Sequence, residues 1–382
     1  MSDIYLDYNA STPIDPRVVD TMRPLLDGPF ANPSATHPGG RAARAVIDRA
    51  RSQVAALLGC APDEIVFTSG GSEANNLALK GVFFALRERG EHIITTTVEH
   101  PAIVEPARFL ERLGARVTRV PVDRFARVDP DDIRRAITPR TILISVMHAN
   151  NEVGTIEPVA EIGAIARERG VLFHTDAAQS VGKIPMRVDE LGVDMLSIAG
   201  HKVYGPKGVG ALYLRSGVRL EPLIHGANHE SGRRAGTESS LLTAALGAAC
   251  ELAADLTSMV EVRQLRDLFW DLLAALFGER VVLNGHPAHR LPNTLSVSFP
   301  GRVGSDILVA LDGVAASVGS ACHAGSVELS PVLRAMEVPP EIGMGAIRFS
   351  LGRATTEAEI REVVDRLDRV LAAGVGEQVS VG

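Results

Sequence analysis

Short apolar segments alternate with helix-like segments between residues 64 and 214, and this alternation restricts the fold more than any other feature of the chain. We expect buried strands at 64–68, 93–97, 116–122, 141–147, 171–174, 195–198 and 211–214. Segments with helical periodicity lie between most of them, at 73–89, 101–113 and 159–169. Strands that alternate with helices form a mainly parallel sheet with helices on both faces. The sequence therefore predicts an α/β protein with a helix-covered central sheet.

The pattern changes after about residue 255. A long helix is predicted at 256–277, strands at 294–299 and 346–351, and a last helix from Thr356, where Glu359 completes a capping box. This order of elements indicates a second, smaller α+β domain. We therefore divide the chain into three parts: an N-terminal arm (1–15) that packs on the small domain, a large domain (16–255) and a small C-terminal domain (256–382).

Composition and charge exclude several classes of function. The 46 acidic residues outnumber the 39 basic ones, and the net charge of −7 disfavours a nucleic-acid-binding or membrane-binding surface. We see no signal peptide at the N-terminus, and the apolar region 241–256 is too short and too interrupted to span a membrane. The three widely spaced cysteines predict neither a disulfide framework nor a metal site. We expect a cytoplasmic protein without a bound metal.

Polar side chains follow two neighbouring predicted strands within 171–210. Asp176 and Gln179 come after the first strand, and His201 and Lys202 after the second. Ligand groups gather at the carboxyl ends of strands in open α/β sheets. An acid and a lysine at one edge suit pyridoxal 5′-phosphate, because the lysine forms a Schiff base and the acid keeps the pyridine nitrogen protonated. The alternative is that Asp176 caps a helix and Lys202 is a surface residue.

A glycine turn between a predicted strand and a helix, at 67–76, is a candidate anion site. Backbone N–H groups at Gly71 and Ser72, with the Ser72 hydroxyl, suit a phosphate at a helix N-terminus. No lysine follows the glycines, so nucleoside triphosphate binding is disfavoured. The alternative is a plain glycine turn. The glycine-rich segment 205–210 has the wrong spacing for a dinucleotide loop, and we interpret it as structural.

Ten short motifs occur in order along the chain. They are 6–13 (LDYNASTP), 32–34 (NPS), 67–73 (FTSGGSE), 98–101 (VEHP), 150–154 (NNEVG), 174–179 (HTDAAQ), 200–202 (GHK), 233–238 (RRAGTE), 319–322 (GSAC) and 347–352 (IRFSLG). With these motifs the chain resembles, over nearly its whole length, the cysteine desulfurases, which are pyridoxal-phosphate enzymes of the class V aminotransferase group. The segment around Cys322 is similar to the type that supplies sulfur for iron–sulfur clusters. This resemblance implies a pyridoxal-phosphate-dependent transferase of fold type I and a homodimer.

The resemblance implies roles around the cofactor ring. Lys202 would form the Schiff base and later move the α-proton of the substrate. Asp176 would pair with the ring nitrogen, and Gln179 would hydrogen-bond the ring oxygen. His100 would stack on the ring and assist proton transfer.

The resemblance also implies how the phosphate and the substrate are held. Ser72, its neighbour Gly71 and His201 would hold the phosphate, and Thr237 would reach the phosphate from the partner subunit. Asn151, which also lies at the cofactor, and Arg348 would clamp the substrate carboxylate. An arginine suits that position, because its planar fork matches a carboxylate. Many relatives carry serine where this chain has Ala199, which would remove one phosphate contact, and others carry serine at the position of Ala235.

Cys322 is the candidate nucleophile, and it lies in a run of small residues. Such a run suits a mobile loop. The resemblance implies that the Cys322 thiolate takes the sulfur of L-cysteine as a persulfide and that L-alanine is released. Neighbouring His323, if protonated, would lower the pKa of this thiol. We interpret Cys60 and Cys250 as small buried apolar residues.

Two alternatives remain open from the sequence. One is a selenocysteine lyase, which would act on L-selenocysteine with the same lysine and cysteine. The other is a sulfur-relay module whose main role is docking a scaffold or sulfur-acceptor protein. The short glycine-rich end, 372–382, gives little support to a docking helix. His225 and His229 are spaced like metal ligands, but Gly226 indicates a loop, so we predict no zinc site.

Overall fold

The computed structural model describes residues 4–323 and 326–373, and it describes side chains for residues 4–319 and 328–372. Its central sheet has seven strands in the order β2-β8-β7-β6-β5-β3-β4. The strands are β2 Ile65–Thr68, β3 His92–Thr96, β4 Arg116–Val120, β5 Thr141–Ser145, β6 Leu172–Asp176, β7 Met195–Ala199 and β8 Gly210–Leu214. All neighbouring pairs from β7 to β4 are parallel, and β8 alone runs antiparallel to both its neighbours. The mainly parallel α/β fold is therefore confirmed.

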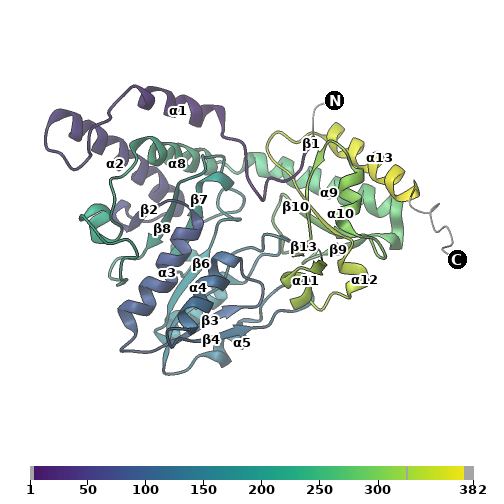
Figure 1. The fold of residues 1–382 in the computed structure, drawn as a ribbon, viewed down its shortest axis with the longest axis horizontal. Helices are drawn as coiled ribbons and strands as arrows, with labels where there is room; N and C mark the ends of the chain where they lie inside the picture. The colour runs from purple at the N-terminus through teal and green to yellow at the C-terminus, as the bar shows by residue number, and fades with distance from the viewer. Residues whose placement is uncertain (1–3, 324–325, 374–382) are drawn as a thin grey trace.

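Helices cover both faces of this sheet (Figure 1). Alternate strand residues point to opposite faces, so Ile144 and Leu196 join one apolar cluster, whereas Leu143 and Met195 join another. The first cluster includes α2 and α8, and the second includes α3 and α4. The helices of this part are α1 Pro16–Leu26, α2 Pro38–Leu58, α3 Gly71–Leu86, α4 Pro101–Glu111, α5 Pro130–Ala136, α6 Val159–Arg169, α7 Val188–Leu191 and α8 Ser240–Ala253.

A second, four-stranded sheet lies at the other end of the molecule (Figure 1). It is antiparallel throughout, in the order β12-β15-β10-β9, and it packs against α9 and α13 around Phe269, Phe349 and Leu367. The strands of this sheet are β9 Val282–Asn284, β10 Thr294–Ser298, β12 Ser317–Val318 and β15 Ala346–Ser350. The helices of this part are α9 Thr257–Phe277, α10 Gly304–Ala310, α11 Pro331–Ala335, α12 Pro340–Gly343 and α13 Glu357–Ala373. The division of the chain into three domains stays a prediction.

The N-terminal segment lies along the second sheet. β1 Ile4–Tyr5 pairs in parallel with β11 Val314–Ala315, and the Leu6 side chain is fully buried in the cluster beneath. Asp7 continues the pairing as a bridge to Ser350 of β15. The chain then crosses to the central sheet, where the N–H of Thr12 donates to the carbonyl of His201. The first residues of the protein thus connect both sheets.

Helix ends follow the local sequence signals. Pro16 follows the N-cap Asp15 of α1, and α2 ends at Gly59, whose φ of 71° is a left-handed cap that favours glycine. At the start of α13 the Thr356 N–H donates to Glu359 Oε2 at 2.7 Å, and the Glu359 N–H donates to Thr356 Oγ1 at 3.3 Å. This reciprocal pair confirms the predicted capping box.

Across residues 4–323 and 326–373, no single helix has the length and apolar composition to cross a membrane; α8 with the segment from α9 to Arg280 meets the criteria only as a pair bent by 71°.

Candidate functional site

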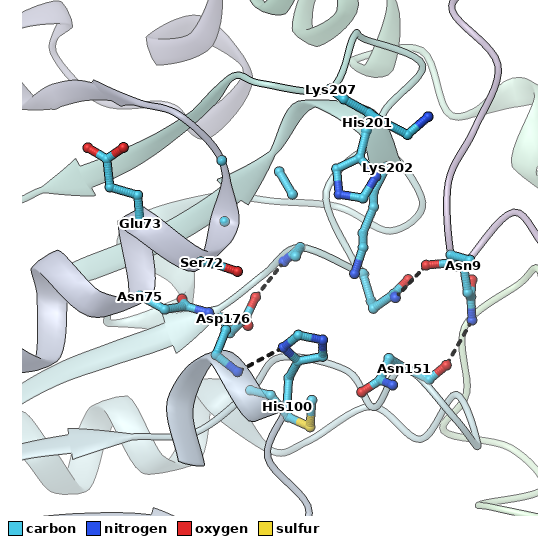
Figure 2. Close-up of a pocket in the computed structure, with 18 of the residues that line it drawn as sticks. Asn9, Ser72, Glu73, Asn75, His100, Asn151, Asp176, His201, Lys202 and Lys207 are labelled. Atoms are coloured by element: carbon cyan, nitrogen blue, oxygen red, sulfur yellow. Dashed lines mark hydrogen bonds between the residues drawn. The ribbon is translucent and has the colours of Figure 1, made fainter. Parts of the chain in front are cut away.

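A cavity of about 570 Å³ opens at the carboxyl ends of β6 and β7. Figure 2 shows the side chains of Lys202, Asp176 and His100 converging on it. Nine of the predicted site residues line this one cavity: Gly71, Ser72, His100, Asn151, Asp176, Gln179, His201, Lys202 and Arg348. They come from sequence positions up to 277 residues apart (348 − 71), and they include the four residues that follow the two predicted strands, Asp176, Gln179, His201 and Lys202.

Two predicted residues stand apart from this cavity. Thr237 lines a separate cavity of about 110 Å³ beside Phe67 and Arg234. The backbone of Cys322 lies in β13 Ser320–His323, which pairs with β14 Ser326–Leu329 as an antiparallel hairpin, with Cys322 opposite Val327. The side chains of Cys322 and His323 lie outside the described ones, and so does the tip of the hairpin at 324–325. The predicted mobility of this segment stays a prediction.

Asp176 ends β6 and is only 7% exposed. Its Oδ2 accepts a hydrogen bond from Asn75 Nδ2 at 2.7 Å, and its Oδ1 accepts from the N–H of Ala178 at 2.9 Å. Both bonds fix the orientation of the carboxylate, and each oxygen keeps capacity for a further donor. The sequence did not indicate Asn75, because its contact with Asp176 depends on how α3 packs against the sheet.

Lys202 belongs to the short 3₁₀ helix η2 Gly200–Lys202, directly after β7. Burial lowers the pKa of its amine, while the neighbouring Asp176 carboxylate acts in the opposite direction. A lowered pKa increases the fraction of neutral amine, which is the form that attacks a carbonyl group.

His100 is the N-cap of α4, and its ring lies in the cavity (Figure 2). Its Nδ1 accepts a hydrogen bond from the N–H of Ala102 at 3.1 Å. Burial lowers the pKa of the ring, with a further contribution from the Lys202 charge. The ring is therefore neutral near pH 7, and its proton lies on Nε2, because Nδ1 must supply the lone pair. His100 thus offers a hydrogen-bond donor.

The first turn of α3 forms one wall of the cavity. Gly70, the N-cap, provides no side-chain hydrogen bond to the helix, so the N–H groups of Gly71 and Ser72 are available. A Cβ on Gly71 would lie 3.2 Å from the Cβ of Ala199, so the backbone approaches closely here. Across this turn, His201 Nδ1 is buried without a hydrogen-bond partner among the described residues. These donors, together with the helix dipole, form a site for an anion.

Arg348, on β15, brings a cation to the opposite wall. Its Nη1 donates to the Asn151 carbonyl at 2.9 Å, and its Nη2 donates to Asp7 Oδ1 at 2.7 Å. Its Nε is buried and has no hydrogen-bond partner among the described residues. A guanidinium held in place, with its Nε–H left over, suits a carboxylate ligand.

Several pocket residues were not indicated by the sequence. Asn9 and Glu73 line the cavity, and so do Lys207 and Gly208 of the segment that we interpret as structural. Glu73 is paired with Arg234, whose Nε lies 2.8 Å from its Oε1. The described residues contain no group of three or more His, Cys, Asp or Glu side chains that could hold a metal ion.

Comparison with known proteins gives one consistent family. The family model described as "Aminotransferase class-V" matches residues 4–363. A "Cysteine desulfurase IscS" from Dictyoglomus turgidum is 50% identical over 97% of this chain and 94% of its own length. A human "Cysteine desulfurase" is 45% identical over 95% of this chain and 80% of its own length.

Solved structures agree with this likeness. A "NifS-like protein" superposes with a TM-score of 0.91 at 37% identity, over 97% of this chain and all of its own. A second structure, titled "SspA in complex with cysteine", gives a TM-score of 0.83 at 38% identity, over 92% of this chain and all of its own.

Proposed function

We propose that the central cavity binds pyridoxal 5′-phosphate and L-cysteine, because the chain belongs to the class V aminotransferase family and, within it, to the cysteine desulfurases. The enzyme then transfers the sulfur of L-cysteine to Cys322 and releases L-alanine. The observation that carries this proposal is the placement of an amine and a fixed carboxylate, Lys202 and Asp176, in a single cavity. Two further walls of that cavity are the first turn of α3, which can bind an anion, and Arg348, whose positive charge can bind a carboxylate.

The residues present fit the cofactor. Two buried nitrogens without partners among the described residues, Arg348 Nε and His201 Nδ1, fit a ligand that carries anionic groups, to which Arg348 donates and His201 can donate from Nδ1. When bound, pyridoxal phosphate supplies an aldehyde that bonds to amines and a ring that accepts the electron pair released at the α-carbon of the substrate. Lys202 would hold the aldehyde and Asp176 the ring nitrogen. The first turn of α3, Ser72 and His201 would hold the phosphate.

The protein side chains carry out binding and proton transfer. Arg348 and Asn151 hold the substrate carboxylate, which fixes the position of the α-hydrogen. Lys202, as a neutral amine, accepts the α-proton. His100 would lie against the bound ring and would donate from Nε2, because its Nδ1 accepts from Ala102.

The sulfur transfer balances without another reactant. The Cys322 thiolate attacks the sulfur of the bound substrate, so a sulfur–sulfur bond forms and the carbon–sulfur bond breaks. The electron pair of the broken bond stays with the substrate carbon, which takes up a proton. The net change converts L-cysteine and the Cys322 thiol into L-alanine and a Cys322 persulfide.

We also propose a cytoplasmic homodimer in which Thr237 completes the phosphate site of the partner subunit. The separation of Thr237 from the cavity of its own subunit supports this arrangement. The persulfide would supply iron–sulfur clusters or another sulfur-containing cofactor through a scaffold or acceptor protein.

The decisive experiment measures alanine release from L-cysteine and from L-selenocysteine, with wild type and Cys322→Ala. We expect turnover of L-cysteine by the wild type and a loss of ~10³-fold or more in the variant. Cys250→Ala is the matched control, because burial raises the pKa of the Cys250 thiol to about 12 and keeps it protonated. If only L-selenocysteine reacts, the enzyme is a selenocysteine lyase. Turnover of neither substrate, with bound cofactor, would favour a docking role and would contradict the proposal.

A further inference from the structure

Lys183 is a buried lysine that has no carboxylate partner among the described residues. It follows β6 by seven residues and is only 7% exposed. The charged groups that act on it are Lys202 and Arg348, both cations. Burial first, and then these two charges, hold the pKa of Lys183 well below its usual range. Whether charged or neutral, the Lys183 amine has at least two N–H bonds with which it can donate.

Those two N–H bonds have two acceptors. Lys183 Nζ lies 3.1 Å from Gln179 Oε1 and 3.2 Å from Asn9 Oδ1. Gln179 is 4% exposed and lines the main cavity. Its amide nitrogen Nε2 also donates to the backbone carbonyl of Asn9 at 3.0 Å. Lys183 therefore contacts the central cavity through Gln179.

These contacts determine which way the Gln179 amide faces. A flipped amide would place its oxygen against the Asn9 carbonyl, where two acceptors would meet. The same flip would place its NH₂ group against the Lys183 amine and would remove the acceptor for that N–H. With the oxygen bound to Lys183 and one N–H bound to Asn9, Gln179 keeps its second N–H as the donor that it can offer to a ligand.

We propose that Lys183 is a positioning residue that fixes the Gln179 amide so that it presents a hydrogen-bond donor, and not an acceptor, to the ligand in the cavity. This inference rests on the proposed function for the identity of that ligand, in which Gln179 faces the ring oxygen of the cofactor. A donor at that oxygen stabilises its anionic form. Lys183 thus lowers the pH at which the bound cofactor loses its proton, although Lys183 does not contact the cofactor.

The test compares Lys183→Met with wild type, both loaded with pyridoxal phosphate. The readout is the pH midpoint of the change in visible absorbance of the bound cofactor. Without a fixed donor the ring oxygen loses a charge-assisted hydrogen bond, so the bound cofactor should keep its proton to higher pH. We expect the midpoint to rise by about one pH unit. An unchanged midpoint would overturn the inference.

Two further variants distinguish an effect that acts through the Gln179 amide from a non-specific loss of order in the site. Asn293 Nδ2 donates to the same Asn9 Oδ1 at 3.0 Å, and no hydrogen bond joins Asn293 to Gln179 among the described side chains. Asn293→Ala should therefore leave the midpoint unchanged. In a Gln179→Leu background, Lys183→Met should add no further shift, because the amide through which it acts is gone. An additive shift, or an equal shift in Asn293→Ala, would contradict the proposal.

A cofactor-free measurement keeps this inference distinct from the proposed function. If the wild type forms no visible complex with pyridoxal phosphate, the proposed function fails. Crystal structures of the cofactor-free wild type and Lys183→Met then decide the inference. We expect the Gln179 amide to rotate in the variant, and an unmoved amide would overturn the inference. Should Lys183→Met not fold, Lys183→Gln takes its place, with the same expected rotation and a smaller shift, since its shorter chain cannot reach both acceptors.

Discussion

The chemistry of this pocket depends on side chains whose charge state is set by burial. Lys202 and His100 both have lowered pKa values, chiefly through desolvation, and both face the same cavity. Lowering both pKa values favours the neutral amine and the neutral imidazole, which are the forms that can accept a proton at one group and donate a hydrogen bond at the other. This is the arrangement that the transfer of an α-proton needs.

Replacing Lys202 by alanine should remove covalent attachment of the cofactor. We expect Lys202→Ala to lose the visible absorbance of the cofactor–lysine bond and all turnover of L-cysteine. Borohydride reduction followed by peptide mass spectrometry is the measurement, and wild type should carry the cofactor on Lys202. Lys207→Ala is the control, because Lys207 also lines the cavity but lies outside η2. Covalent label in Lys202→Ala would refute the assignment.

A second prediction at the residue scale concerns Glu157, which is 3% exposed and accepts the N–H of Val128. Burial first, with a contribution from the Glu99 charge, raises the pKa of Glu157 to about 8. The folded protein keeps this proton up to about pH 8, whereas the unfolded chain releases it near 4.5. The contribution to stability is therefore full below pH 4.5 and is lost as the pH rises towards 8.

Glu157→Gln cannot ionise and should not suffer this loss. Relative to wild type, the variant should gain free energy of unfolding between pH 5 and pH 8, by on the order of a few kcal/mol. Urea unfolding at the two pH values measures the difference. Glu161→Gln, on the exposed side of α6, is the control and should show no such trend. A difference that does not depend on pH would mean that Glu157 is ionised in the folded protein.

The sequence predicted the charged residues at the centre of the site better than the residues that hold them in place. Asp176 and Lys202 could be placed because each directly follows a strand, and strand ends meet at one edge of a parallel sheet. Asn9 and Lys183 could not, since their roles depend on contacts that form only when the N-terminal segment crosses the sheet. The Nζ–Oδ1 contact between them joins positions 174 apart in the chain.

At the scale of elements, the orientation of β8 was the main detail that strand–helix alternation did not reveal. About ten residues connect β7 to β8, and they include η2 with Lys202. A parallel return would need a crossover of roughly a dozen or more residues, so β8 runs antiparallel. β1, β9 and the strands from β11 to β14 were also not predicted. They have two to four residues each, too few to show a periodic pattern.

The loop that carries Thr237 is held by a buried ion pair, which gives a prediction about an element. Arg51 Nη2, on α2, lies 2.6 Å from Glu230 Oε1, and the side chains of Arg51 and Glu230 are 10% and 1% exposed. Glu230 Oε2 also accepts the N–H of Phe67 at 2.8 Å. Glu230 has a positive φ of 47°, a conformation that its side-chain contacts must maintain.

Glu230→Gln should leave a buried guanidinium without its counter-charge and cost about 3 kcal/mol of unfolding free energy. The exposed pair Arg44–Asp48 on the same helix is the matched control. Asp48→Asn should cost about 0.5 kcal/mol or less, because exposed pairs are screened by water. Chemical denaturation of both variants gives the comparison. Equal losses would show that the buried pair does not hold the loop.

At the scale of the whole molecule, the cavity lies where three distant parts of the chain meet. The N–H of Asn9 donates to Ser350 Oγ at 2.9 Å across 341 residues, and Asn9 Nδ2 donates to Thr294 Oγ1 at 2.9 Å. The helix-covered sheet could be predicted from local periodicity. The junction could not, because it consists of polar contacts between residues that are remote in the sequence and show no local pattern.

Thr237 provides the last prediction, because it tests whether the catalytic unit is a dimer. Thr237→Ala should weaken cofactor binding in the partner's site, and Lys202→Ala should inactivate the subunit's own site. When the two variants are unfolded and refolded together, half of the dimers should be mixed. Each mixed dimer then has one site with an intact Lys202 and an intact Thr237 of the partner subunit. At limiting cofactor, about a quarter of wild-type activity should return.

The control for this experiment is each variant refolded alone, which should remain inactive under the same conditions. Recovery would require that the two residues act in the same site from different chains. If Thr237 acted within its own subunit, every site in the mixture would lack one of the two residues, and no activity would return. Activity measured against the mixing ratio, with its maximum at equal amounts, therefore decides between a site completed across a dimer and one that a single chain completes.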